Sequence, residues 1–411
     1  MTGARIGGRA TAAVVGALVG ALVVLGVDGV DGVDGLARTP RPATGPQTSG
    51  FPQTRVEAPS QYKVADSRVL LAWSPGGLPS GTEKTLENMA GVRSATTVIA
   101  GLDWISAARA RDGTPLDAPP RGFAIPWEVA LIQPREYAAF VPAAERDVVL
   151  GLRRGEALLA ETETALRGAG EGIEVDLGDR TLRASAVVSD IATNGYEALI
   201  SGRAPRSWTR ADRFVLVRLQ RASRRFAVRR RILELLPPGK VLRIRAQGET
   251  PFLRYGDAVQ SQMLIKSSFG EFAARPLPDG RIEIEPQWLH RNIRRARVPV
   301  LGTITCHRAI FPQLREALRE IVSDGVAYVI DRDPGEFGGC FNPRFIDRQP
   351  GGRLSHHAWG IALDINVSEN AFGTPPDQDK RLVDRMEAWG FTWGGRWLIP
   401  DGMHFEWNRW P

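Results

Sequence analysis

The chain is short of the residues from which disulfide-rich and zinc-finger proteins are built. Among its 411 residues only two are cysteines, Cys306 and Cys340, and five are histidines. Two cysteines so far apart form no zinc knuckle by themselves. They could form one disulfide in an oxidising compartment or stay as two buried thiols, and the sequence leaves both alternatives open. A hydrophobic content of 43% over this length supplies more core than a single small domain needs.

Acidic residues are fewer than basic ones, 46 against 53, which leaves a net charge of +7. A surface with this excess should attract anions such as wall polymers, phospholipid head groups or nucleic acid, which is a bias and not a function. The most basic stretch, residues 223–236, would suit a polyanion. A solvated helix that buries Ile232, Leu233 and Leu236 accounts for it better. We therefore predict no nucleic-acid partner, and nothing in the sequence indicates a protein partner.

Charged residues are absent from Ala10 to Val27, a run of 18 residues that follows Arg5 and Arg9. Such a run is an export signal or a membrane anchor. It is longer than a usual signal core and shows no convincing cleavage site, which favours an uncleaved anchor with its basic residues inside. Either alternative places the rest of the chain at the cell surface or outside the cell.

Large apolar residues are also scarce from residue 28 to 65, where three VDG repeats precede a stretch rich in Pro, Thr, Ser and Gly. This composition predicts a flexible linker between the N-terminal segment (1–27) and the folded chain. Alternating apolar runs then predict an α+β domain of unknown role over 66–235. The breaker LLPPGK (235–240) marks its end. A second α+β domain, 241–411, holds all five histidines and seven of the eleven tryptophans.

Two local patterns stand out in the first of these domains. Residues 156–166 carry Leu158, Leu159 and Leu166 with a helical spacing, so we expect a helix there. Residues 173–188 alternate around Gly178 and Asp179, which predicts a hairpin. The stretch 155–188 faintly resembles the extracytoplasmic domains of bacterial export-type ABC permeases, and no functional residue follows from that.

The stretch SHHAWGIALD (355–364) gathers two of the scarce histidines and a carboxylate. Ile361, Leu363 and Ile365 alternate with small or polar residues, as in a half-buried strand that carries Asp364 on its open face. On one continuous strand His357 would lie about 23 Å from Asp364. Gly360 offers the turn that folds the chain back. His356 should then point away from this centre.

A second cluster, PDGMHFEW (400–407), supplies further ligand types. If MHFEW is a strand, His404 and Glu406 share one face, while Phe405 and Trp407 pack on the other. Asp401 lies three residues before His404. Two histidines and one carboxylate would leave a fourth tetrahedral position open, as catalytic zinc sites do.

Together, SHHAWGIALD and DGMH (401–404) resemble the motifs of the zinc D-alanyl-D-alanine peptidase family. This family includes D,D-carboxypeptidases, vancomycin-resistance D,D-dipeptidases and phage L-alanyl-D-glutamate endopeptidases, which cut peptidoglycan stem peptides. The resemblance extends over about residues 260–411, including CHRAIFPQL (306–314) and GGCFNPRFI (338–346). It implies a small catalytic domain with an antiparallel sheet.

The resemblance also implies a role for each matching residue. His357, Asp364 and His404 match the ligands of Zn²⁺, although such a set also holds other divalent ions. Asp401 matches the acidic general base and Arg308 the arginine that stabilises the tetrahedral intermediate. The remaining implied roles concern the substrate: Ser355 lines its site, and Arg344 is a candidate for holding its carboxylate.

Several alternatives stay open at this stage. Glu406 could orient His404 or compete with Asp401 as the base, and we favour Asp401. A disulfide between Cys306 and Cys340 would hold the loops of both arginines at the cleft. The function predicted first is a D-alanyl-D-alanine carboxypeptidase, and its rivals are an L-alanyl-D-glutamate endopeptidase and a non-catalytic wall-binding module. The aromatic stretch 389–397 should pack against the core.

Overall fold

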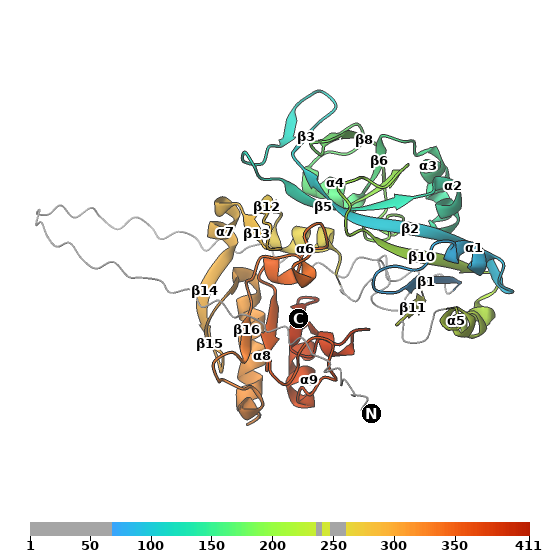
Figure 1. Cartoon of the computed structure of the whole chain (residues 1–411). Helices are drawn as coiled ribbons and strands as arrows, with labels where there is room; N and C mark the ends of the chain where they lie inside the picture. Colours follow the sequence, from blue (N-terminus) through green and yellow to red (C-terminus); the bar gives the residue numbers. More distant parts are fainter. Residues whose placement is uncertain (1–67, 236–240, 247–259) are drawn as a thin grey trace, which may run out of the picture. The chain divides into compact units, whose positions relative to one another are not determined.

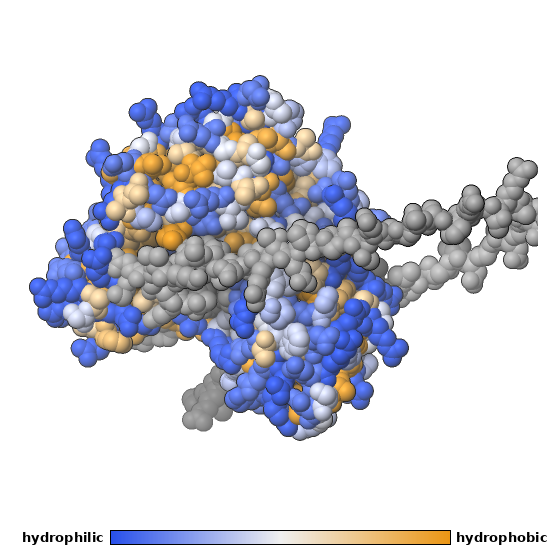
Figure 2. Space-filling model, turned by 180° about the vertical axis from the view of Figure 1, so that it is seen from behind, coloured by the Kyte–Doolittle hydropathy of each residue, from blue (hydrophilic) through white to orange (hydrophobic). Residues whose placement is uncertain are grey.

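The computed structural model describes residues 68–235, 241–246 and 260–411. The described chain is mixed α+β, as predicted (Figure 1). The expected N-terminal anchor (1–27) and the whole of the expected linker (28–65) lie outside these residues. Among the helices that are described, none is long and apolar enough to cross a bilayer. On the face drawn in Figure 2, hydrophilic residues dominate and hydrophobic ones gather in small groups.

An eleven-stranded, largely antiparallel sheet forms the first part of the described chain, in the order β11-β1-β10-β2-β5-β9-β6-β8-β7-β3-β4. Only the β5–β9 and β6–β8 pairs are parallel. Its strands are β1 (Val69–Trp73), β2 (Val92–Ile105), β3 (Ala107–Arg109), β4 (Pro115–Asp117), β5 (Ile125–Ile132), β6 (Glu156–Ala160), β7 (Glu174–Asp176), β8 (Thr181–Val188), β9 (Ala198–Ser201), β10 (Asp212–Leu219) and β11 (Arg243–Ala246). The helices of this part are α1 (Thr82–Glu87), α2 (Pro134–Tyr137), α3 (Arg146–Gly151), α4 (Glu161–Arg167) and α5 (Arg225–Leu233).

Three sequence predictions can be compared with this sheet. The hairpin is confirmed, since β7 and β8 pair with Asp176 opposite Thr181. The helix expected over 156–166 is wrong in its first half, because residues 156–160 form β6 between two hydrogen-bonded neighbours, and α4 begins only afterwards. In α5 Ile232 is buried as expected, but Leu233 is 54% exposed, and Leu236 lies outside the described residues.

The predicted boundary at residues 235–240 stays a prediction. The strand that follows it, β11, pairs with β1 and so belongs to the large sheet. From residue 260 onward the described chain supplies most of a second core, which also includes Leu102 of β2.

This C-terminal part contains three small antiparallel sheets: β12–β13, β14–β15 and the four-stranded β16-β17-β19-β18. The bounds are α6 (Gln262–Phe269), β12 (Ala274–Pro276), β13 (Ile282–Ile284), α7 (Pro286–Asn292), β14 (Ile293–Val298), β15 (Gly302–His307), α8 (Phe311–Ser323), β16 (Phe337–Gly339), β17 (Ala362–Ile365), α9 (Lys380–Ala388), β18 (Phe391–Trp393) and β19 (His404–Trp407). The antiparallel sheet predicted for this domain is thereby confirmed.

The four-stranded sheet has one apolar and one polar face. Leu363 and Ile365 of β17, with Phe405 and Trp407 of β19, join a core that includes residues of α8 and α9. Because side chains alternate along a strand, the residues between them must face the other way. That opposite face carries the candidate functional site.

Candidate metal centre

Strand pairing brings the two sequence clusters side by side. In the antiparallel register of β17 and β19, Asp364 lies opposite His404, and Ala362 lies opposite Glu406. All four side chains therefore occupy the polar face of the sheet. The small Ala362 leaves room next to Glu406.

A short turn brings His357 to the same face. Residues His356–Ala358 form a 3₁₀ turn whose first N–H groups are capped by Ser355, since the Ser355 hydroxyl accepts from the His357 N–H at 3.3 Å. Gly360 then adopts φ 68°, a left-handed conformation that favours glycine, and a Cβ there would meet the His307 nitrogen at 2.8 Å. The turn expected at Gly360 is present.

The two imidazoles converge on one carboxylate oxygen. His357 Nε2 lies 3.2 Å and His404 Nδ1 lies 3.1 Å from Asp364 Oδ1. The ring centroids of the two histidines are 5.1 Å apart. His357, Asp364 and His404 each offer one ligand atom, and these atoms all lie within 4.8 Å of one another. Two imidazoles and a carboxylate at this separation fit the donor set of a zinc ion.

Acceptors on the outer nitrogens set the tautomers of both rings. His357 Nδ1 lies 2.9 Å from the Cys340 carbonyl oxygen, which can only accept, so Nδ1 carries the proton. His404 Nε2 lies 3.3 Å from Glu406 Oε2 and donates to it in the same way. The remaining nitrogen of each ring faces Asp364. This is the arrangement in which imidazole lone pairs bind a cation.

The electrostatics of the cluster favour positive charge at its centre. Burial alone would raise the pKa of Asp364, but His357 and His404 outweigh it and hold this pKa well below its usual range. Burial lowers the pKa of His404, but the hydrogen bonds to Asp364 and Glu406 reverse the effect and raise it to about 10. The carboxylates therefore stabilise a cation between them, whether it is a proton or a metal ion.

Asp401 sits beside this centre with one oxygen unused. The turn from Asp401 to His404 is closed by the His404 N–H donating to the Asp401 carbonyl at 3.2 Å. The side-chain oxygen Oδ1 of Asp401 is buried without a hydrogen-bond partner. Burial raises the pKa of Asp401, and the neighbouring charge of Asp364 adds to the rise, while His404 opposes it. A buried carboxylate oxygen without a partner is costly unless another group uses it.

Of the two predicted arginines, Arg344 has the clearer electrostatic link to the centre. Burial lowers the pKa of Arg344, whereas the charges of Asp364 and Asp401 raise it. Its carbonyl oxygen accepts the Ser355 N–H at 3.0 Å, which ties the arginine's loop to the turn of His357. Arg308 is exposed and begins the 3₁₀ turn Arg308–Ile310 directly after β15.

A disulfide joins the segments that carry these arginines. Cys306 of β15 is bonded to Cys340, which follows β16, across a separation of 34 residues. The same Cys340 offers its carbonyl oxygen to His357. The disulfide therefore fixes the support of a candidate ligand as well as the start of the Arg308 turn.

Two residues of the site were missed in the sequence. His356 was expected to point away, but its Nδ1 lies 2.7 Å from Glu406 Oε2, the oxygen that His404 also contacts. Trp397, assigned to core packing, has its ring centroid 5.1 Å from that of His404. The adjacent histidines and the Glu two residues after His404 were signals for the first contact. His307, treated as structural, is buried, and His290 is exposed.

A second acidic cluster is paired with basic side chains of the same chain. Glu163, Glu197 and Glu271 are also close enough to hold an ion. Arg167 pairs with Glu163 and Glu271, and Lys266 pairs with Glu197 and Glu271. Because all three carboxylates are already paired with basic side chains, we assign the cluster to an ion-pair network and not to a metal site.

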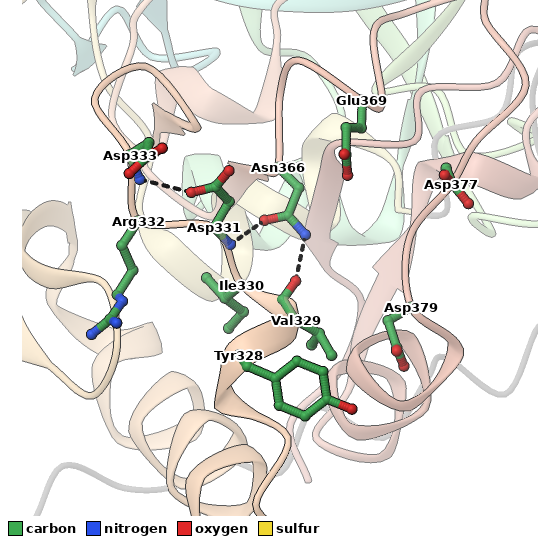
Figure 3. Close-up of a pocket in the computed structure, with 10 residues that line it drawn as sticks. All are labelled: Tyr328, Val329, Ile330, Asp331, Arg332, Asp333, Asn366, Glu369, Asp377 and Asp379. Atoms are coloured by element: carbon green, nitrogen blue, oxygen red, sulfur yellow. Dashed lines mark hydrogen bonds between the residues drawn. The ribbon is translucent and has the colours of Figure 1, made fainter.

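Beyond the end of β17 lies an open cavity of about 670 Å³ (Figure 3). Figure 3 shows the Asn366 amide holding the adjacent loop: its oxygen accepts the Asp331 N–H, and its nitrogen donates to the Val329 carbonyl, both at 2.8 Å. Acidic side chains line the rim of the cavity, and exposed acidic side chains are common on loops without any bound ion. We assign it no ligand.

The comparisons with known proteins found similar solved structures and a family model. No curated protein matches it. Among solved structures it is similar to the periplasmic region of MacB from Actinobacillus actinomycetemcomitans, at 12% identity and a TM-score of 0.29, over 44% of this chain and 90% of that one. It is also similar to the extracellular domain of the noncanonic ABC-type transporter YknZ from Gram-positive bacteria, at 10% identity and a TM-score of 0.22, over 39% and 88%. TM-scores this low support no inference about this chain.

A family model matches part of the C-terminal region by sequence. The matched region, residues 348–407, begins before the turn of His357 and ends with β19. It thus contains every residue of the candidate metal centre together with Asp401. Residues 348–407 match the family model of the D-alanyl-D-alanine carboxypeptidases, so this part of the chain is similar to that family of peptidases.

Proposed function

We propose that the chain is a zinc-dependent peptidase that removes the terminal D-alanine from peptidoglycan stem peptides. The observation that carries the proposal is the meeting of His357, Asp364 and His404 next to a buried carboxylate oxygen of Asp401 that has no partner. A structural metal site needs no such carboxylate, whereas hydrolysis needs a base.

The three ligand candidates would hold the ion through His357 Nε2, His404 Nδ1 and an Asp364 oxygen. Bound there, zinc would lower the pKa of a water molecule to about 7 and polarise the scissile carbonyl. The chain's own groups perform the remaining steps. Asp401 accepts the proton of the attacking water, and its raised pKa brings it closer to the working pH, as a general base requires.

The arginines and Ser355 would position the substrate. A guanidinium offers a fixed pair of donors that matches a carboxylate or a developing oxyanion. We assign the terminal carboxylate of the stem peptide to the largely buried Arg344 and the oxyanion to Arg308. Ser355 caps the turn of His357, so its first role is to hold that ligand in place.

We also propose that the protein works outside the cytoplasm, held to the membrane by residues 1–27. The support is the uncharged run in the sequence, together with a disulfide, a bond typical of oxidising compartments.

The test is metal analysis combined with digestion of defined stem peptides, with products identified by mass. We expect about one zinc per chain and release of single D-alanine residues. His404→Ala should abolish both, while its circular dichroism stays that of the wild type. Cleavage between L-Ala and D-Glu would replace the carboxypeptidase with an endopeptidase. Binding of muropeptides without any cleavage by the zinc-loaded protein would leave a wall-binding module.

A further inference from the structure

A chain of buried side chains runs from His356 to the candidate metal centre. His356 Nδ1 lies 2.7 Å from Glu406 Oε2, and the same oxygen lies 3.3 Å from His404 Nε2. On the other side of its ring, His404 Nδ1 faces Asp364 Oδ1 at 3.1 Å. His356, Glu406 and His404 are each at most 7% exposed, so water does not compete for these contacts.

The two histidine ligands are supported by acceptors of different kinds. The outer nitrogen of His357 donates to a backbone carbonyl, that of Cys340, which a disulfide holds in place. The outer nitrogen of His404 depends on the Glu406 side chain. A side chain on a strand can rotate, so a second contact on the Glu406 carboxylate helps to keep its oxygen on the His404 ring.

His356 supplies that second contact. It lies on the same 3₁₀ turn as His357, so one short segment presents a candidate ligand and a support for the other ligand, 48 positions away in the sequence. Because the Glu406 carboxylate only accepts, the His404 nitrogen that faces it must carry the proton, while His356 Nδ1 packs closely against the same oxygen. His404 is then left with its lone pair on Nδ1, toward the centre.

We infer that His356 is a positioning residue which, through Glu406, fixes His404 in the orientation and tautomer that bind the metal. The inference rests on the proposed function and adds a residue to its site. It also assigns Glu406 to the support of His404, because its carboxylate is already engaged by two imidazoles, and leaves the role of base to Asp401.

The experiment measures the zinc dissociation constant of the full chain by competition with a chromogenic chelator. Loss of a support of this kind weakens metal binding by about 10-fold to 100-fold. We expect a loss in this range for Glu406→Ala and about 10-fold for His356→Phe. His356→Gln should recover much of the affinity, because its amide N–H can still donate to Glu406. The Co²⁺-loaded variants should show altered d–d absorption, which a change in stability alone would not produce.

A double variant separates positioning from a general structural effect. If His356 acts through Glu406, adding His356→Phe to Glu406→Ala causes no further loss of zinc affinity. If the two residues act independently, the fold-losses in zinc affinity of the two single variants multiply. His307→Gln is the matched control: it removes another buried histidine, of 3% exposure, whose ring nitrogens bond the backbone of Phe269 and Ala309, and its zinc affinity should equal the wild type's. Should His356→Phe not fold, His356→Ala replaces it.

The outcomes distinguish this inference from the proposed function. Wild-type zinc affinity in both His356→Phe and Glu406→Ala, with binding lost in His404→Ala, would overturn the inference and leave the proposed function standing. A wild-type chain whose zinc affinity does not depend on His404 would overturn the proposed function itself.

Discussion

Asp401 tests the proposed chemistry at the scale of a single residue. We expect Asp401→Asn to lower kcat by about 10² to 10⁴, because the amide keeps the shape of the side chain but cannot accept the proton. Zinc affinity should remain within about threefold of the wild type, since Asp401 is not among the residues that would hold the ion. Steady-state kinetics on a stem peptide and chelator competition measure the two quantities.

Asp333→Asn is the control for this substitution. It removes a carboxylate that is exposed on the loop after α8, and it should leave kcat unchanged. A full rate in Asp401→Asn would transfer the role of base to another group.

His307 gives a prediction about pH and stability. Its Nε2 donates to the Phe269 carbonyl at 3.1 Å, and its Nδ1 accepts the Ala309 N–H at 3.2 Å, so the neutral ring uses both nitrogens. Burial lowers the pKa of His307 from 6.5 to about 4, and the charge of Arg308 adds to this. Between pH 6.5 and pH 4, His307 therefore binds a proton in the unfolded chain but stays neutral in the folded chain.

The stability contributed by a neutral His307 is thus complete above pH 6.5 and is lost as the pH falls toward 4, with a difference of about 3 kcal/mol. We expect the free energy of unfolding to fall more steeply over this interval in the wild type than in His307→Gln, which has no titrating group there. Urea titrations at pH 7, 5.5 and 4 measure both. If the free energy of unfolding fell equally with pH in the wild type and in His307→Gln, His307 would not be held neutral in the folded chain.

The residue-scale predictions from sequence succeeded where the evidence was local. Alternation along each strand correctly placed Asp364, His404 and Glu406 opposite the apolar residues. The contact between His356 and Glu406 could not be read in this way. It depends on the register that sets Ala362 opposite Glu406, and a register belongs to two strands far apart in the sequence.

At the scale of elements, the disulfide connects β15 with the loop after β16. Closing a loop of this length, 34 residues, stabilises the fold by about 4 kcal/mol through the entropy of the unfolded chain. We expect the free energy of unfolding of the double variant Cys306→Ser/Cys340→Ser to be lower than that of the wild type by about this amount. Zinc binding should weaken as well, because the Cys340 carbonyl that holds His357 is no longer fixed. Thermal unfolding and chelator competition, with the reduced wild type as a second sample, measure both effects; unchanged zinc affinity would confine the disulfide to stability.

The same scale shows why β6 was mistaken for a helix. Glu, Ala and Leu are strong helix formers, and residues 156–160 contain only these three types. They form a strand because β8 and β9 pair with them on either side, and tertiary pairing overrides a weak local preference. Helix α4 follows at once, so the helical spacing was correct for the second half of the segment.

At the scale of the whole described chain, a buried ion pair links the large sheet to α6. Lys266 of α6 pairs with Glu197, which precedes β9, and both side chains are fully buried. Burial would lower the pKa of Lys266, but Glu197 and Glu271 outweigh it and hold this pKa above its ordinary value. The same helix ends at Phe269, whose carbonyl binds His307. The ion pair therefore supports the helix on which the first residues of the second core are built.

Removing one partner of this pair should be costly. Lys266→Met leaves Glu197 buried without its cation, and we expect a loss of about 3–5 kcal/mol in the free energy of unfolding. Glu197→Gln/Lys266→Met should recover a large part of that loss, since the neutral amide can still accept from the Glu128 N–H as Glu197 does. Urea unfolding of the full chain, followed by circular dichroism and by tryptophan fluorescence, measures both variants. A single variant as stable as the wild type, or a double variant less stable than the single one, would mean that the pair is not what joins the sheet to α6.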